Sequence, residues 1–198
     1  MLYINQNDYA HIHYEHNLDQ GGVPPEKQNV KTAGCGLCCV TMVINHLTTK
    51  RFTIRDAVRI AGKTGANRVH GSRMRVMAPY LAEKYNLKYQ RTNSVSEAIA
   101  CLQRGGEVIA LVRGDRDGQM GLFTRIGHYI TLISYDGEEF CILDPGYTEE
   151  NFKIPERAAK VRIEYPFTYC TPTIIEEAAD NEVAAYYLFE RAKNTDTK

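Results

Sequence analysis

Residues 34–47 read GCGLCCVTMVINHL, with a glycine on each side of Cys35 and apolar residues almost all round from residue 36 to residue 47. A helix that is apolar on every side is buried, so this stretch predicts a helix at the centre of the core. Cys35 stands at its start, where free N–H groups and the helix dipole lower the pKa of a thiol. The flanking glycines let other groups approach closely. Cys35 is therefore a candidate nucleophile, with a buried structural cysteine as the alternative.

Three further helices are expected in the first half of the chain, over residues 53–61, 73–85 and 94–104. The first and the third begin with Thr or Ser followed three positions later by an acidic residue, which is the pattern of a capping box. Residues 73–85 carry apolar side chains at helical spacing.

The second half of the chain is rich in strand patterns. Residues 108–112 form a continuous apolar run, and residues 128–135 alternate and are rich in β-branched and aromatic types. Asp136-Gly137 is a hairpin turn signal, and residues 139–144 predict the returning strand. Helices followed by an antiparallel sheet indicate the α+β class.

The length of 198 residues fits a single domain. Residues 151–198 are expected to form a C-terminal extension of uncertain role. Within this extension, residues 174–192 are amphipathic and predict a helix.

The composition excludes several classes of protein. Lys plus Arg and Asp plus Glu are equal at 24 each, so the chain lacks the basic excess of a nucleic-acid-binding protein. No apolar run is long enough to cross a membrane. The first residues, MLYINQNDYAHIH, do not form a secretory signal, so we expect a cytoplasmic protein, with a trimmed secreted chain as the alternative. Most of the six cysteines are expected to be free thiols, because a chain of this size does not need disulfides.

His128 and Asp144 are the expected partners of Cys35. His128 begins one strand of the predicted hairpin and Asp144 ends the other, at similar distances from the Asp136-Gly137 turn. Residues at such positions lie at the same end of the ladder, which brings imidazole and carboxylate close together. A base oriented by a carboxylate is the arrangement that activates a cysteine. The alternatives are a strand histidine satisfied by backbone and a turn-forming aspartate before proline.

Four motifs occur in the order Gln, Cys, His, Asp: Gln6-Asn7-Asp8-Tyr9, Gly34-Cys35-Gly36, Phe123-Thr124 shortly before Gly127-His128-Tyr129, and Leu143-Asp144-Pro145-Gly146. In these motifs, over roughly residues 3–150, the chain resembles the bacterial papain-like peptidases related to the leader-processing domains of bacteriocin ABC exporters. The resemblance implies a papain-like cysteine peptidase fold, with an N-terminal helical part packed on a C-terminal antiparallel sheet.

The resemblance also implies that Gln6 supplies an oxyanion-hole side chain, together with the backbone N–H of Cys35. Gln20 and Gln28 are competing candidates for this role, because the segment between Gln6 and Cys35 contains an insert rich in His and Pro. The sequence departs from the family at Leu37-Cys38-Cys39, where Pro-Thr-Ser is common.

Two other chemistries fit parts of the sequence. Cys35 and Cys38 form a C-x-x-C pair, which suggests a thiol-disulfide redox protein, although the βαβ context of that motif is missing. His11, His13 and His16 suggest zinc, but a second ligand pair at finger spacing is missing, and a solvated loop is the preferred interpretation.

The sequence therefore predicts a hydrolase, a cysteine peptidase that cleaves a peptide or related amide bond through a thioester on Cys35. No cofactor and no metal are expected. The alternatives are an acyl or peptide transferase of the same fold, as in phytochelatin synthesis, the redox protein, and a non-catalytic peptide-binding module. Loops 62–73 and 114–127 are expected to line the substrate groove.

Overall fold

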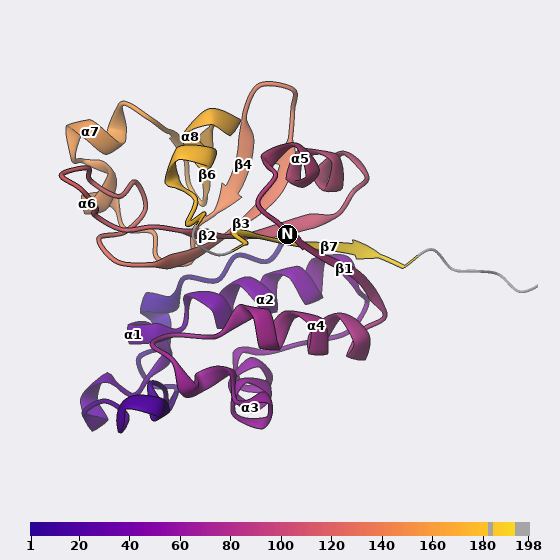
Figure 1. Cartoon of the computed structure of the whole chain (residues 1–198), viewed down its shortest axis with the longest axis vertical. Helices are drawn as coiled ribbons and strands as arrows, with labels where there is room; N and C mark the ends of the chain where they lie inside the picture. Colours follow the sequence, from indigo (N-terminus) through magenta and orange to yellow (C-terminus); the bar gives the residue numbers. More distant parts are fainter. Residues whose placement is uncertain (182–183, 193–198) are drawn as a thin grey trace, which may run out of the picture.

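The computed structural model describes residues 1–181 and 184–192 and places helices on both faces of an antiparallel sheet (Figure 1). The strands are ordered β1-β7-β2-β3-β4-β6-β5, with bounds β1 Leu87–Thr92, β2 Glu107–Val112, β3 His128–Tyr135, β4 Phe140–Leu143, β5 Arg162–Glu164, β6 Phe167–Cys170 and β7 Tyr186–Arg191. The α-helices are α1 Val30–Ala33, α2 Cys35–Leu47, α3 Ile54–Thr64, α4 Met74–Lys84, α5 Val95–Gln103, α6 Glu149–Phe152, α7 Pro155–Ala158 and α8 Pro172–Ala178. Short 3-10 helices span Gln6–Tyr9, Leu18–Gln20, Pro25–Lys27 and Ala66–Arg68.

Helix α2 lies at the centre of one face of the sheet, against β2 and β3, with α3 packed against it and α4 packed against β1 (Figure 1). Nearly every residue of α2 is buried, and none of the residues from 36 to 44 is exposed. The prediction of a buried central helix is confirmed. Because α2 begins at Cys35, its packing fixes the position of the thiol at one end of the sheet.

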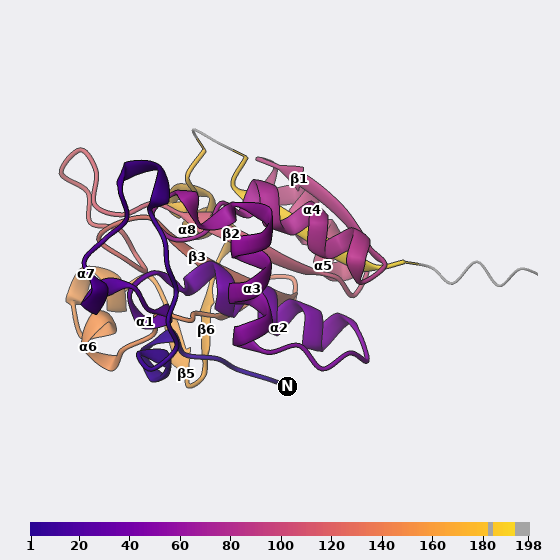
Figure 2. The same cartoon turned by 90° about the horizontal axis from the view of Figure 1, so that it is seen from below.

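Helices α5 to α8 lie on the other side of the sheet (Figure 1). This face has its own apolar core, built from α5, α8 and the alternate residues of β2, β3 and β4. A view at right angles shows the first residues of the chain running beneath the end of α2 (Figure 2). No helix in the described ranges 1–181 and 184–192 is long and apolar enough to cross a membrane.

The helices expected around α2 are present as α3, α4 and α5. The capping box of α3 is complete, since Thr53 accepts from the Asp56 N–H and the Asp56 carboxylate accepts from Thr53 N–H. The box of α5 is only half formed. Ser94 accepts from the Glu97 N–H, but the Glu97 carboxylate accepts from Gln90 instead.

The predicted helix over residues 174–192 is wrong. The structure has the short helix α8 and then β7, which pairs with β1 on one side and β2 on the other; residues 182–183 lie outside the described part. The four apolar residues 186–189 pack alternately into the two cores, which only a strand covered on both faces can do. Residues 151–198 thus contribute β5, β6 and β7 to the sheet.

The β3–β4 hairpin contains a β-bulge. Thr131 lies opposite Leu143, but the register shifts between Leu132 and Ser134, so that β3 has one extra residue on the turn side of the ladder. A shift of one residue exchanges the two faces of a strand. With the bulge, His128 faces the same side of the sheet as the end of β4, where Asp144 follows.

Candidate active site

Cys35 is the first residue of α2 and is partly exposed, whereas Cys38 and Cys39 behind it are buried. Gly34 is the N-cap and supplies no capping side chain. The backbone N–H groups of Tyr129 and Gly36 point to the Cys35 sulfur. A Cβ at Gly36 would lie 3.2 Å from atoms of Met74, Ser72 and Tyr129, so a side chain there would crowd the surroundings of the thiol. The close approach of β3 to α2 depends on this glycine.

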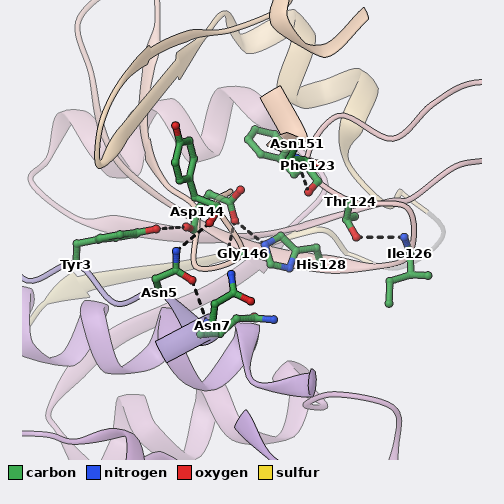
Figure 3. A network of polar contacts seen from close by, with 12 residues as sticks. Tyr3, Asn5, Asn7, Phe123, Thr124, Ile126, His128, Asp144, Gly146 and Asn151 are labelled. Atoms are coloured by element: carbon green, nitrogen blue, oxygen red, sulfur yellow. Dashed lines mark hydrogen bonds and ion pairs between the residues drawn. The ribbon is translucent and has the colours of Figure 1, made fainter. Parts of the chain in front are cut away.

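His128 lies between Cys35 and Asp144. Its Nε2 is 2.7 Å from Oδ1 of Asp144, and both side chains are buried, at 8% and 0% exposure (Figure 3). His128 and Cys35 also interact, since each is among the causes of the other's pKa shift. Because Nε2 contacts the carboxylate, Nδ1 is the ring nitrogen left to serve the thiol. The three residues predicted from the sequence are thus brought together in the order that nucleophilic catalysis requires.

The ionisation of the pair follows from these contacts. Burial raises the pKa of the Cys35 thiol. His128 and the two backbone N–H groups lower it by a larger amount, so the net pKa lies below its ordinary value. Burial lowers the pKa of His128, but Asp144 and Cys35 raise it to about 10. Both directions favour a thiolate–imidazolium pair at neutral pH.

The turn that follows β4 holds Asp144 in place (Figure 3). Gly146 N–H donates to Asp144 Oδ1 at 2.7 Å, and the Tyr3 hydroxyl donates to the Asp144 carbonyl at 2.7 Å. The Asn5 side chain donates to the Tyr147 carbonyl at 2.9 Å. A Cβ at Gly146 would lie 2.8 Å from Cε1 of the His128 ring. Sequence reasoning missed these supports, because only the fold shows that residues 3–5 reach this turn.

Gln6 lies at the same site. Its N–H donates to the Pro145 carbonyl at 2.8 Å, and its side chain lines a cleft together with Cys35 and His128. Its Nε2 donates one hydrogen to the Lys31 carbonyl at 2.9 Å, and its buried Oε1 has no hydrogen-bond partner. The competing candidates Gln20 and Gln28 do not line this cleft. The structure therefore brings Gln6, and neither rival, to the thiol.

The cleft has a volume of about 610 Å³ and opens beside Cys35. Residues 69–73 line it, as do Thr124, Ile126 and Gly127, and these are parts of the two loops expected from the sequence. Tyr129 and Tyr187, which meet edge to face, add an aromatic wall. A volume of this size is typical of ligand sites, so a segment of a peptide fits beside the thiol.

The structure also bears on the rival chemistries. All six cysteines are free, and Cys38 is fully buried, with a pKa that burial raises well above its usual range. Among the described residues, no group of three or more His, Cys, Asp and Glu side chains could hold a metal ion. His16 is buried against Tyr14, while His11 and His13 are exposed.

Comparison with known proteins places the chain in a family. Residues 20–173 match the model of the Peptidase_C39 like family. The chain belongs to the C39-like peptidase family. No curated protein matches its sequence. Gln6 lies outside the matched residues, whereas Cys35, His128 and Asp144 lie within them.

Two solved structures share the fold. A protein from Bacillus anthracis assigned to the C39-like peptidases aligns with a TM-score of 0.55 and 14% identity, covering 81% of this chain and 90% of its own. The peptidase domain of Streptococcus ComA, a bifunctional ABC transporter involved in a quorum-sensing pathway, aligns with a TM-score of 0.53 and 11% identity. The alignment covers 81% of this chain and 93% of that domain. The C39-like fold expected from the sequence is therefore confirmed, and family and fold together support a cysteine peptidase in general.

Proposed function

We propose that this member of the C39-like family is a peptidase that uses Cys35 as its nucleophile, His128 as its acid and base, and Asp144 as the group that orients the imidazole. The observation that carries the proposal is that His128, held by Asp144 at 2.7 Å, lines a cleft of about 610 Å³ together with Cys35.

In the proposed reaction, the Cys35 thiolate attacks the carbonyl carbon of the scissile amide. Negative charge then develops on the carbonyl oxygen, where the Cys35 N–H and the second hydrogen of Gln6 Nε2 stabilise it. His128, which is protonated before the attack, gives its proton to the leaving amine. The neutral imidazole next activates water, which hydrolyses the thioester and restores the thiolate.

The peptide as substrate class is also a proposal. It rests on family membership and on a cleft of about 610 Å³ that both Cys35 and His128 line, together with residues of the two loops expected from the sequence. A reducing, cytoplasmic environment is proposed as well, because all six thiols are free and a thiolate nucleophile must stay reduced.

The test is to incubate the purified chain and its Cys35→Ala variant with a mixed peptide library and to identify the products by mass spectrometry. We expect cleavage by the wild-type chain only. Intact-mass measurement on the wild-type chain, quenched with acid during turnover, adds a check, since an acyl adduct on Cys35 would mark the thioester. Cleavage that survives in Cys35→Ala would refute the proposal. Products joined to an added amine would identify a transferase instead.

A further inference from the structure

The arginine side chains that line the active-site cleft have no acidic side chain beside them in its lining. Arg73, Arg75, Arg91 and His70 line it, and none of its lining residues is Asp or Glu. The whole chain has equal numbers of basic and acidic residues, so this local excess is not a consequence of composition. A cleft lined by one sign of charge concentrates ligands of the opposite sign.

Two of these arginines have no ion-pair partner among the described residues. Arg73 forms an ion pair with Asp19 at 3.4 Å, outside the cleft. Arg75, at the start of α4, and Arg91, in β1, form no ion pair or side-chain hydrogen bond with any described residue. Arg91 lies over the Tyr187 ring, 5.9 Å from its centroid. Arg75 and Tyr187 line the same cleft, so the two arginines are available to one ligand beside its aromatic wall.

We propose that the cleft selects peptides with Asp or Glu close to the scissile bond, bound by Arg75 and Arg91. This inference rests on the proposed function, because it names the substrate class of the same site. Guanidinium groups bind carboxylates through paired hydrogen bonds, and the neighbouring Tyr187 ring gives the peptide an apolar surface.

The test uses matched peptides that differ only in having Glu, Gln or Lys at positions flanking the scissile bond. Binding is measured on Cys35→Ala by fluorescence anisotropy, so that it does not depend on turnover, and KM and kcat are measured on the wild-type chain. We expect Glu peptides to bind about tenfold more tightly than Gln peptides and Lys peptides more weakly still, with the preference decreasing as salt is added.

Substitutions of the arginines test whether Arg75 and Arg91 cause the preference for Glu peptides. Arg75→Gln with Arg91→Gln should remove most of the preference by raising KM with little change in kcat. Arg55→Gln, an exposed arginine on α3 outside the cleft, should keep it. Equal binding of Glu and Gln peptides, or a preference that survives the double variant, would overturn this inference while leaving Cys35-dependent cleavage intact. Loss of the proposed function would appear differently, as cleavage independent of Cys35.

A second cavity carries an independent inference. It has a volume of about 730 Å³ and lies between the loop of residues 113–122, α7 and α8, away from Cys35. Arg157 of α7 lines it with 2% of its surface exposed, and its Nε and Nη2 atoms are buried without a hydrogen-bond partner. Burying a charged group without partners is costly, so such groups are normally paired.

The surroundings of Arg157 leave a positive excess. Arg113 and Lys160 also line the cavity, opposed by Glu156 and Glu177, and Lys160 is paired with Glu177 at 3.9 Å. Burial is the main cause that lowers the pKa of Arg157, while Asp115 raises it and Arg125 lowers it further. Met120, Leu122 and Ile174 supply apolar walls.

We infer that this cavity binds a small molecule through an oxyanion group, a phosphate or a carboxylate, that completes the hydrogen bonds of Arg157. The site also has a connection to the catalytic residues. Residues 113–114 and 118–122 line this cavity, and Thr124, Ile126 and Gly127 of the same loop line the cleft and lead directly into His128.

The probes are inorganic phosphate and succinate, each compared with sodium chloride at equal ionic strength, and the readout is the Tm of the full chain. We expect a saturable rise in Tm with at least one of the two anions, and the more effective anion identifies the group. Arg157→Met should abolish the rise without lowering the Tm in the absence of anion, because it replaces an unpaired charge with an apolar side chain of similar length.

Two further measurements keep this inference falsifiable. Arg157→Lys, which keeps the charge but not the planar fork, should weaken the apparent affinity about tenfold or more. Arg55→Met, on the far helix α3, should respond to anions like the wild type. A wild-type Tm that rises no more with phosphate or succinate than with chloride, or an equal rise in Arg157→Met, would overturn the inference.

Discussion

Asp144 influences the ionisation of the proposed nucleophile through His128, mainly by its negative charge. Its carboxylate is buried, accepts from Gly146 N–H and contacts His128 Nε2 at 2.7 Å. The negative charge is the main contribution that raises the pKa of His128, and the protonated imidazole in turn lowers the pKa of Cys35. The state of the thiol thus depends on a residue that it does not touch.

Replacing Asp144 with Asn should therefore lower the pKa of His128 and raise that of Cys35. At about pH 6, where an ordinary thiol is protonated, we expect Cys35 of the wild-type chain to react with iodoacetamide much faster than the other five cysteines. In Asp144→Asn this rate should fall about tenfold or more, and kcat/KM by about 10²–10⁴-fold. Peptide mapping of the labelled thiols measures the rates, with Asp117→Asn, in an exposed loop, as control. Equal labelling of all six cysteines would contradict the ion pair.

Gly146 is required for close packing beneath the imidazole. A Cβ there would lie 2.8 Å from Cε1 and 3.0 Å from Nε2 of His128, distances that force the ring to move. We expect Gly146→Ala to reduce kcat/KM about 10–100-fold, because small displacements of catalytic groups have effects of that size. Gly62→Ala, where a Cβ meets nothing within 4 Å, is the matched control and should keep full activity. Normal activity of Gly146→Ala would show that the turn tolerates a side chain.

At the scale of elements, the N-terminal segment and the turn after β4 form one unit. Residues 3–6 bind residues 144–147 through the Tyr3 hydroxyl, the Asn5 side chain and the Gln6 N–H. These contacts join two segments that are about 140 residues apart in sequence. Positioning of Asp144 and of Gln6 therefore depends on the same set of hydrogen bonds.

Tyr3→Phe tests this connection, because it removes the hydroxyl that donates to the Asp144 carbonyl and leaves the ring. We expect a loss of about 0.5–1.5 kcal/mol in the free energy of unfolding, a decrease of about 2–4 °C in Tm, and a drop in kcat of less than tenfold. Tyr165→Phe is the control, since its exposed ring contacts Tyr3 edge to face and its hydroxyl makes no hydrogen bond to a described residue. An unchanged Tm in Tyr3→Phe would show that the bond adds nothing.

The hairpin was only partly predictable. Its strands and turn follow from the alternation of residues 128–135 and from Asp136-Gly137, but the bulge between Leu132 and Ser134 leaves no such pattern. Without the bulge, the pairing of residues 134–135 with residues 140–141 would continue along the whole hairpin. His128 would then face the opposite side of the sheet from Asp144. His128 and Asp144 lie close together, as predicted, because the bulge adds one residue to β3 that a regular hairpin would not contain.

At the scale of the whole molecule, His46 joins the N-terminus, α2 and the sheet. Its Nδ1 lies 2.8 Å from the Glu107 carboxylate of β2, and its Nε2 lies 2.8 Å from the Leu2 carbonyl. Burial lowers the pKa of His46, but Glu107 and Leu2 raise it to a net value above the ordinary one. Burial raises the pKa of Glu107 despite the opposing effect of His46.

These shifts predict how stability varies with pH. A histidine whose pKa is raised on folding adds stability that is full below its unfolded pKa and is lost as pH rises through the folded value. A carboxyl whose pKa is raised by burial acts in the same direction. His46→Gln should therefore lower the Tm more at about pH 5.5 than at about pH 8.5. His11→Gln, at an exposed position, should leave the Tm unchanged at both pH values. A larger effect at the higher pH would contradict the assigned pKa direction.

The sequence by itself determined the buried helix α2, the position of Cys35 at its start, and the strand pair that carries His128 and Asp144. These features depend on periodicity, glycine and turn residues, which act over a few positions. Only the tertiary structure decided that residues 186–191 form a strand between β1 and β2, because an apolar run buried on both faces has no period that separates strand from helix. It alone also brought Tyr3 and Gln6 to the turn that carries Asp144, and Gly146 to the imidazole, and placed Arg75 and Arg91 in one cleft, since these contacts join segments far apart in the chain.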